Sequence, residues 1–375
     1  EFRLHLVPSG IFYPQTTCII GSGVVVNPAI LLQEISEIQA HGVDVSRLIL
    51  SDRAHLTMPY HILLDKAEEK RRGQAMIGTT CRGIGPAFAD KAARIGIRAD
   101  DLLDDNSFYR HLKSVLDIKN EILAKIYNVA PVSLEKTYEQ YRDYGKQLAP
   151  MIQETSTILH KGLANNDSIL LEGAQGALLD LDFGTYPYVT SSSPLAGAGA
   201  VGSGLGPREI NHVIGVFKAY NTRVGEGPMP TELKDEFGDL MREKGHEYGA
   251  TTARPRRCGW FDAVAARFSI QLNSCDATAL THLDVLDSLS TIKICTSYQA
   301  NREILSYFPS KTSLLKQCQP IYEELPGWQT STRNIHSFQQ LPAKALAYIA
   351  RLEELSGCPI KFISTGPRRE QVIRR

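Results

Sequence analysis

The sequence has no excess of charge of either sign and no long apolar run. Lys plus Arg and Asp plus Glu number 41 each among 375 residues, so the formal net charge is zero. A chain without a positive field is not expected to bind nucleic acid or an anionic membrane through bulk electrostatics. We also find no apolar stretch of membrane-spanning length and no secretory signal peptide. We therefore predict no nucleic-acid partner and no membrane partner, and any anion site must be local.

The seven cysteines never occur as CxxC, and their number is odd. This pattern argues against a disulfide framework and against a zinc site. We expect reduced thiols, a cytoplasmic location and no metal ligands within this chain.

Two phosphate-binding motifs are missing or misplaced. The pattern GxxxxGK[ST] is absent, since Gly145-Lys146 is followed by glutamine. A GxGxxG pattern occurs within 197–202, but a Ser/Pro loop precedes it where a strand is required. We interpret 191–207 as a mobile Gly/Ser-rich loop. The chain also starts without Met inside an alternating, strand-like run, which we interpret as the loss of an upstream segment.

Strand-like and helix-like patterns alternate along most of the chain, which is typical of a largely parallel α/β sheet. Residues 100–162 differ, because apolar residues there recur at helical spacing. We predict one α/β domain over 1–375, with a mostly parallel central sheet flanked by helices, similar to P-loop NTPases, and a helical insertion at 100–162. Expected strands include 47–52, 74–80, 168–176, 212–220 and 360–366.

The segment 77–94 combines hydroxyl, glycine and basic residues after one expected strand. Thr80, a second threonine and two glycines can bring donors to an anion beside a helix that begins at Pro86. That helix would carry Lys91 and Arg94. A phosphate site and an ordinary loop with a solvated basic face explain this pattern about equally well.

Other polar residues follow expected strands, at the edge where open α/β sheets bind ligands. Gln175 could contact a base or a sugar, and Thr190 adds a hydroxyl. The carboxylate of Asp284 can accept two hydrogen bonds from the ring N–H and the amine of guanine, a donor pair that adenine lacks. Ser364 and Thr365 offer donors for a base carbonyl. Taken singly, each is more often a cap or loop residue than a ligand contact.

The stretch GATTARPRRCGW, residues 249–260, places three arginines around one proline. Guanidinium groups on a stiffened loop suit bidentate binding of carboxylate or phosphate. The alternative interpretation is a solvated basic turn.

Eight blocks taken together resemble the adenylosuccinate synthetase family, and they extend from the first residues nearly to the end of the chain. They are LVPSGI, SDRAHLTMPYH, IGTTCRGIGPAFADKAAR, LEGAQGALLDLDFGTYPYVTSS, VFKAYNTRVGEGPMPTEL, ATTARPRRCGWFDAVAAR, THLDVLD and STGPRR. The resemblance implies a homodimeric ligase of purine biosynthesis that joins IMP and L-aspartate using GTP and Mg²⁺.

The resemblance also assigns residues to substrates. Thr80, Gln175 and Thr190 resemble IMP contacts, and Arg94 resembles an arginine that reaches the IMP phosphate of a neighbouring subunit. Arg254 would lie near the aspartate carboxylate and ribose. The aspartate loop would comprise Ala250, Thr251, Thr252, Ala253, Arg254, Pro255 and Arg256. The GTP contacts would be Arg256, His282, Leu283, Asp284, Ser364, Thr365 and Gly366.

Three departures from the family pattern stand out. Ala253 replaces a common glycine, and His282 replaces a usual lysine. The family's N-terminal segment, with its general-base Asp, general-acid His and Mg²⁺ ligands, is not in this chain, so we expect these groups before Glu1 and an impaired activity. Lys91 is a weak catalytic candidate. Two alternatives remain: a truncated homologue that binds purine nucleotides without ligation, and a structural or regulatory protein.

Overall fold

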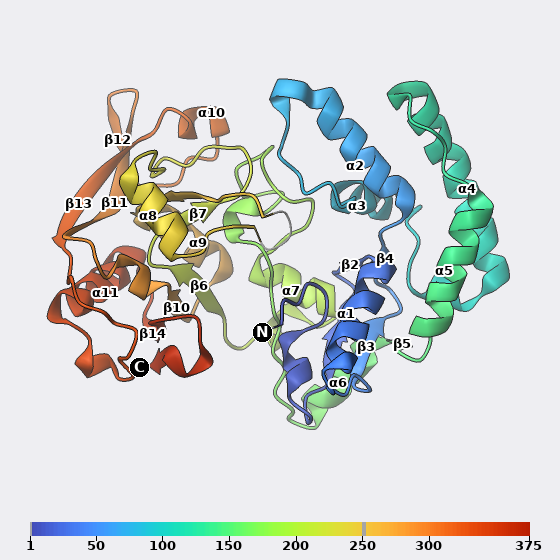
Figure 1. The fold of residues 1–375 in the computed structure, drawn as a ribbon, viewed down its shortest axis with the longest axis horizontal. Helices are drawn as coiled ribbons and strands as arrows, with labels where there is room; N and C mark the ends of the chain where they lie inside the picture. Colours follow the sequence, from blue (N-terminus) through green and yellow to red (C-terminus); the bar gives the residue numbers. More distant parts are fainter. Residues whose placement is uncertain (1, 250–252) are drawn as a thin grey trace. The chain divides into compact units, whose positions relative to one another are not determined.

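A computed structural model describes residues 2–249 and 253–375 of the chain (Figure 1). The chain forms two compact units. Unit 1 comprises Glu1–Gln175 and Thr190–Glu209, and unit 2 comprises Gly176–Val189 and Ile210–Arg375. Within the described residues, no helix is both long enough and apolar enough to span a membrane.

Unit 1 is built on a three-stranded parallel sheet and a two-stranded parallel pair. The sheet has the order β1 (Cys18–Ile20), β3 (Leu48–Ser51), β5 (Ile152–Gln153), and the pair joins β2 (Val25–Val26) to β4 (His55–Leu56). Helix α1 (Pro28–Ala40) begins after Asn27, whose side chain accepts from two backbone N–H groups of the first turn. This cap, with proline at the first helical position, explains why the helix starts where it does.

Helices dominate the next part of unit 1. They are α2 (Pro59–Arg72), α3 (Ile84–Ala93), α4 (Asp105–Glu121) with a π-helical extension Ile122–Ile126, α5 (Leu134–Leu148) and α6 (Thr155–Ala164). In Figure 1, α4 and α5 lie side by side, and the two helices contact each other. Residues 100–162 are thus mainly helical, although β5 within them joins the parallel sheet.

A buried polar triad connects α2, α3 and α4. The Met58 N–H donates to His61 Nδ1 at 3.0 Å, so the ring hydrogen lies on Nε2 and is donated to Asp90 Oδ2 at 2.9 Å. Lys119 donates to the other oxygen of Asp90. Burial lowers the pKa of His61, which therefore stays neutral. The triad fixes α3 against its two neighbours.

Unit 2 contains a four-stranded sheet and a separate antiparallel sheet. In the first, β6 (Ile214–Lys218), β10 (Ala277–Thr281) and β14 (Ile360–Ser364) are parallel, and β15 (Val372–Arg374) is antiparallel to β14. In the second, β11 (Thr291–Ala300) pairs antiparallel with β12 (Glu303–Leu305) and β13 (Gln319–Pro326), and parallel with β9 (Phe261–Asp262). Helices α9 (Ala263–Asn273) and α11 (Ala343–Ser356) contact each other, and their apolar faces join the core.

The remaining elements of unit 2 are short. They are the antiparallel pair β7 (Asn221–Arg223) and β8 (Arg257–Gly259), the helices α8 (Glu236–Lys244) and α10 (Thr312–Leu315), and a 3₁₀ turn η7 (Leu283–Leu286) that follows β10.

Three local predictions are wrong. Residues 74–80 form a 3₁₀ turn and loop instead of a strand. The chain at 168–172 pairs with no described strand, and Leu170 is 89% exposed. The expected mobile loop contains helix α7 (Ala196–Ser203), whose small residues allow close packing. The Gly202 carbonyl accepts from the Gly23 N–H at 2.9 Å, and a Cβ on Gly21 would lie 2.7 Å from the same carbonyl oxygen.

Asp262 determines where α9 begins. Its Oδ1 accepts from the N–H groups of Val264 and Ala265, and its Oδ2 accepts from the buried Tyr298 hydroxyl at 2.6 Å. The helix therefore starts at Ala263, directly after this capping residue.

Asp262→Ala should lower the free energy of unfolding by about 2–4 kcal/mol, because it removes a helix cap and leaves the Tyr298 hydroxyl without its acceptor. Urea denaturation measures the loss. The matched control is Asp235→Ala, since exposed Asp235 caps α8 through Phe237 and Gly238 but has no buried phenol. It should cost only about 1 kcal/mol. Equal losses in the two variants would contradict this account.

Candidate functional site

Three parallel strands of unit 2 bring polar residues to one edge of the sheet. Thr281 at the end of β10 is in register with Lys218 at the end of β6, and Leu280 is in register with Ile363 of β14. The residues that follow these strands therefore meet at their carboxyl ends, where open α/β sheets bind ligands. His282 and Ser364 are both at this edge.

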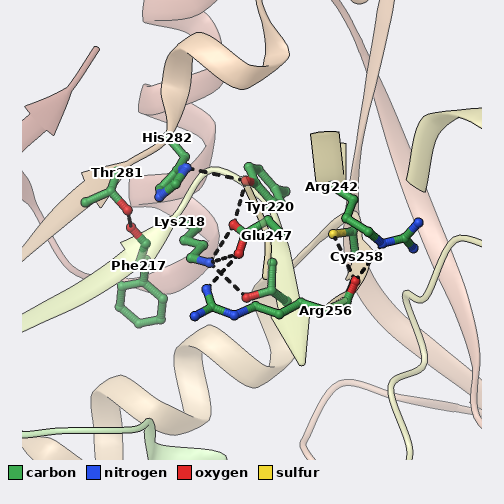
Figure 2. A network of polar contacts seen from close by, with 10 residues as sticks. Phe217, Lys218, Tyr220, Arg242, Glu247, Arg256, Cys258, Thr281 and His282 are labelled. Carbon is green, nitrogen blue, oxygen red and sulfur yellow. Dashed lines mark hydrogen bonds and ion pairs between the residues drawn. The ribbon is translucent and has the colours of Figure 1, made fainter. Parts of the chain in front are cut away.

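The Glu247 carboxylate is the centre of a polar network at this edge. Figure 2 shows Lys218, Tyr220 and Arg256 converging on it. Lys218 Nζ lies 2.6 and 2.7 Å from the two carboxylate oxygens, the Tyr220 hydroxyl donates at 2.7 Å, and Arg256 Nη1 donates at 2.8 Å. The Glu247 side chain is only 1% exposed.

The network keeps Glu247 ionised. Burial acts to raise the pKa of Glu247, but the hydrogen bond and charge of Lys218, with the bonds from Tyr220 and Arg256, lower it overall. One carboxylate thus neutralises one of two cations, and the cluster of Lys218, Arg256 and Glu247 keeps a formal charge of plus one. A positive cluster at this edge suits a phosphate-bearing ligand.

His282 borders the network. Its Nδ1 lies 3.4 Å from the Tyr220 hydroxyl oxygen, and its backbone has a left-handed φ of +59°. Burial, followed by the nearby charge of Lys218, lowers the pKa of His282. The ring is therefore neutral at pH 7.

Asp284 opens onto a pocket of about 450 Å³, a size that suits a small-molecule ligand. Arg333 Nε donates to Asp284 Oδ2 at 3.2 Å, and the arginine side chain is 58% exposed. The polar lining includes Lys244, Asp284, Asp287, Ser288, Thr330 and Arg333. Leu283, by contrast, is buried in the core. The pocket thus combines two carboxylates, Asp284 and Asp287, with two cationic side chains, Lys244 and Arg333.

The turn Ser364–Gly366 uses its side-chain hydroxyls internally. Ser364 Oγ donates to the Gly366 carbonyl at 2.7 Å, and Thr365 Oγ1 donates to the Gln371 carbonyl at 3.2 Å. A Cβ on Gly366 would lie 2.4 Å from Gln371 Oε1, so the turn has no space for a side chain there. These contacts shape the turn, and in this structure both hydroxyls donate to carbonyl groups of the chain.

The arginine-rich stretch divides into residues with different roles. Ala250, Thr251 and Thr252 lie outside the described residues. Ala253 has φ of +50°, the left-handed region that favours glycine. Arg254 and Pro255 are exposed.

Arg257 has a structural role that the sequence did not reveal. Its guanidinium forms a two-pronged ion pair with Glu232, at 2.8 and 2.7 Å, and donates to the Gly227 carbonyl at 2.8 Å. Of the three arginines, Arg254 is exposed, Arg256 is bound to Glu247, and Arg257 anchors its strand.

Unit 1 brings together two of the predicted contacts. Gln175 Nε2 lies 3.4 Å from Thr190 Oγ1, which in turn lies 3.2 Å from Ser192 Oγ. A Cβ on Gly85 would lie 3.3 Å from Ser191 Oγ, so the first turn of α3, directly after the glycine-rich loop, lies beside this hydroxyl cluster. Thr80 is exposed on the same loop.

The N–H groups of that loop already have acceptors. Glu69 on α2 accepts from the backbone N–H groups of Ile77, Gly78 and Thr79 at 3.2, 2.8 and 3.2 Å. Asp65 accepts from the Gly83 N–H at 2.8 Å. Two carboxylates of the chain therefore already accept from backbone donors of this loop, for which the sequence left a phosphate site and an ordinary loop about equally favoured.

Lys91 and Arg94 lie toward the far end of α3. Arg94 is exposed and has a left-handed φ of +64°, directly after the helix. Because a helix rises 1.5 Å per residue, Arg94 is about 15 Å from the loop that opens α3. Lys91 Nζ lies 5.7 Å from the centre of the Phe88 ring, and burial lowers its pKa.

A comparison with protein families identifies the chain, since the profile of the family described as adenylosuccinate synthetase matches residues 1–373. The chain belongs to the adenylosuccinate synthetase family. The α/β class with flanking helices is also confirmed, because the chain matches a solved structure, that of fully ligated adenylosuccinate synthetase from Plasmodium falciparum, with a TM-score of 0.94 at 37% identity. The match covers 99% of this chain and 88% of that one.

Bacterial relatives are closer in sequence. The adenylosuccinate synthetases of Dehalococcoides mccartyi and Heliobacterium modesticaldum are 54% and 52% identical over 373 residues. These matches cover 100% of this chain and 88% and 87% of the relatives. They give no support to the prediction of an impaired activity or to the placement of Mg²⁺ ligands in a missing segment.

Three residues of the candidate site in unit 2 were not predicted from the sequence. Lys218 could have been found, because it lies near the end of the expected strand 212–220. Glu247 and Arg333 carried no signal, since each lies in an irregular segment and gains its role only from contacts distant along the chain.

Glu69→Ala should increase hydrogen exchange at the Ile77, Gly78 and Thr79 amides by about tenfold or more, because each loses a bond to a charged acceptor. Hydrogen exchange read by NMR or mass spectrometry measures this. Glu68→Ala is the matched control, since Glu68 contacts Arg72 on the same helix and not the loop. Unchanged loop exchange in the Glu69 variant would refute the role given to this carboxylate.

Proposed function

We propose that the protein catalyses the GTP-dependent ligation of IMP and L-aspartate. The products are adenylosuccinate, GDP and phosphate: the γ-phosphoryl group of GTP moves to the 6-oxygen of IMP, and the aspartate amine displaces it. Membership of the family supports this reaction. The structural observation that carries it is the pocket of unit 2, where Asp284 follows a strand at the carboxyl edge of the sheet.

The GTP site is proposed at this edge. The Asp284 carboxylate would accept the ring N–H and amine of guanine, while His282 and the Ser364–Gly366 turn lie beside the same strand ends. Arg256, oriented by Glu247, would contact the phosphates as a charge-assisted donor. Leu283, buried in the core, would act by holding the turn that presents Asp284.

The remaining substrates are proposed for other loops. Thr80, Gln175 and Thr190 would bind IMP through hydroxyl and amide groups. The aspartate loop, residues 250–256, would bind L-aspartate, with Arg254 near its carboxylate.

A homodimer is also proposed. Arg94 is exposed about 15 Å from the loop of its own subunit that carries Thr80, which favours an IMP phosphate on a neighbouring subunit. Seven free cysteines favour a reducing, cytoplasmic location.

Mg²⁺, when bound with GTP, would neutralise charge on the transferring phosphoryl group. Within the described residues, no group of three or more His, Cys, Asp or Glu side chains is arranged to hold a metal ion. We therefore derive no step through the metal. The roles proposed for this chain's residues are substrate binding and orientation, and Lys91 is a weak candidate for proton transfer.

The reaction is tested by incubating the protein with IMP, L-aspartate, Mg²⁺ and GTP, and by detecting adenylosuccinate by mass spectrometry. We expect product with GTP and at least about tenfold less with ATP, because adenine lacks the donor pair that Asp284 accepts. Calorimetric titration with IMP and GTP accompanies the assay. Binding of both nucleotides without product would refute the ligation and leave a non-catalytic nucleotide-binding homologue.

Asp284→Asn should reduce the preference for GTP over ITP by about tenfold, because the variant loses one acceptor facing the guanine amine that inosine lacks. The ratio of kcat/KM values for GTP and ITP measures this preference. Asp287→Asn is the control, since Asp287 lines the same pocket but bonds Trp328 and Thr332. An unchanged ratio in the Asp284 variant would contradict the proposed base contact.

A further inference from the structure

A chain of contacts leads from the buried Glu247 carboxylate to the His282 ring. The Tyr220 hydroxyl lies 2.7 Å from Glu247 Oε1 and 3.4 Å from His282 Nδ1 (Figure 2). The two rings meet edge to face, with centroids 5.9 Å apart and an interplanar angle of 86°. Tyr220 is itself buried, so its hydroxyl is shielded from water and contacts the side chains of Glu247 and His282.

The positions of the hydrogens follow from counting donors. A tyrosine hydroxyl has a single hydrogen, and an ionised carboxylate can only accept. Glu247 is ionised because two cations contact it. The Tyr220 hydrogen must therefore point to Glu247, the nearer of the two partners. The Tyr220 oxygen is then left as an acceptor, and its contact with His282 is attractive only if Nδ1 carries a hydrogen.

A neutral imidazole has one N–H and one bare nitrogen, and the partner of one nitrogen determines the state of the other. We propose that Glu247 and Tyr220 are positioning residues that fix His282 with its hydrogen on Nδ1, so that Nε2 is presented to the nucleotide as a hydrogen-bond acceptor. His282 lies at the carboxyl edge of the sheet, two residues before Asp284. The nucleotide part of this inference rests on the proposed GTP site.

The tautomer determines which ligand groups can form a hydrogen bond with His282. A bare Nε2 accepts a hydrogen bond, so it pairs with an O–H or N–H of the ligand and not with a phosphate oxygen. Besides the ring N–H that Asp284 would accept, a guanine nucleotide offers such donors in its ribose hydroxyls and its exocyclic amine. His282 would thus bind the nucleoside, and Arg256 would bind the phosphates.

The tautomer is measured directly by long-range ¹H–¹⁵N NMR on the ¹⁵N-histidine-labelled protein, with the His282 signals assigned through His282→Gln. In the unliganded wild-type protein at pH 7.5, we expect Nδ1 at the shift of a protonated nitrogen and Nε2 at that of a bare nitrogen. The opposite pattern, or an averaged pair of shifts, overturns the proposal without any variant being needed.

Tyr220→Phe removes the hydroxyl and keeps the ring, so the two His282 nitrogen shifts should move toward the average of an unconstrained imidazole. Tyr298→Phe is the matched control, since Tyr298 also donates to a buried carboxylate in unit 2 but lies outside the site. It should leave the His282 shifts unchanged. Equal changes in both variants, or no change in Tyr220→Phe, would overturn the proposal that Glu247 and Tyr220 fix the tautomer of His282.

Titration with Mg·GTP separates this inference from the proposed function. A GTP-dependent change in the His282 Nε2 chemical shift supports the contact. ITP lacks the amine and 2′-deoxy-GTP lacks the 2′-hydroxyl. The analogue that fails to cause the change therefore identifies the donor. If the tautomer is as proposed but GTP does not bind, the proposed GTP site is wrong, while the positioning of His282 by Glu247 and Tyr220 is supported. If GTP binds and the Nε2 signal does not shift, the proposed contact between His282 and the nucleotide is wrong, while the GTP site is supported.

Discussion

The Glu247 carboxylate is the interaction on which the site in unit 2 depends. It accepts hydrogen bonds from Lys218, Tyr220 and Arg256, and is therefore the shared charged partner of two cations and a buried phenol. Removing a single partner of a buried charge costs far more than the pair contributes, because the remaining charge stays buried. The carboxylate therefore sets the positions of the groups around it before any ligand arrives.

Two carboxylates perform the same task in unit 1. Glu69 and Asp65 accept from the backbone of the glycine-rich loop and hold it in a defined conformation. In both units, acidic side chains organise the donors of a candidate anion site. This arrangement answers the question raised by three arginines in a neutral chain: two of them already have carboxylate partners, Glu247 and Glu232, and only Arg254 is exposed.

The sequence predicted the α/β class, the strand ends that carry Asp284 and Ser364, and the family, because these depend on local patterns of hydrophobic and turn residues. It did not predict the acceptors of the loop at 77–83 or the role of Glu247, because those depend on contacts between segments distant along the chain. The loop at 191–207 was misjudged for a related reason, since its glycines serve close helix packing against Gly21 and Gly23.

A double-mutant cycle on Mg·GTP binding tests most directly whether Glu247 orients Arg256, the residue proposed to contact the phosphates. Calorimetry would give dissociation constants for the wild type, Glu247→Gln, Arg256→Gln and the double variant. The account predicts a coupling of at least about 1 kcal/mol, with Glu247→Gln weakening GTP binding only while Arg256 is present. Additive effects within about 0.3 kcal/mol would contradict it, because they would mean that the carboxylate does not act through Arg256.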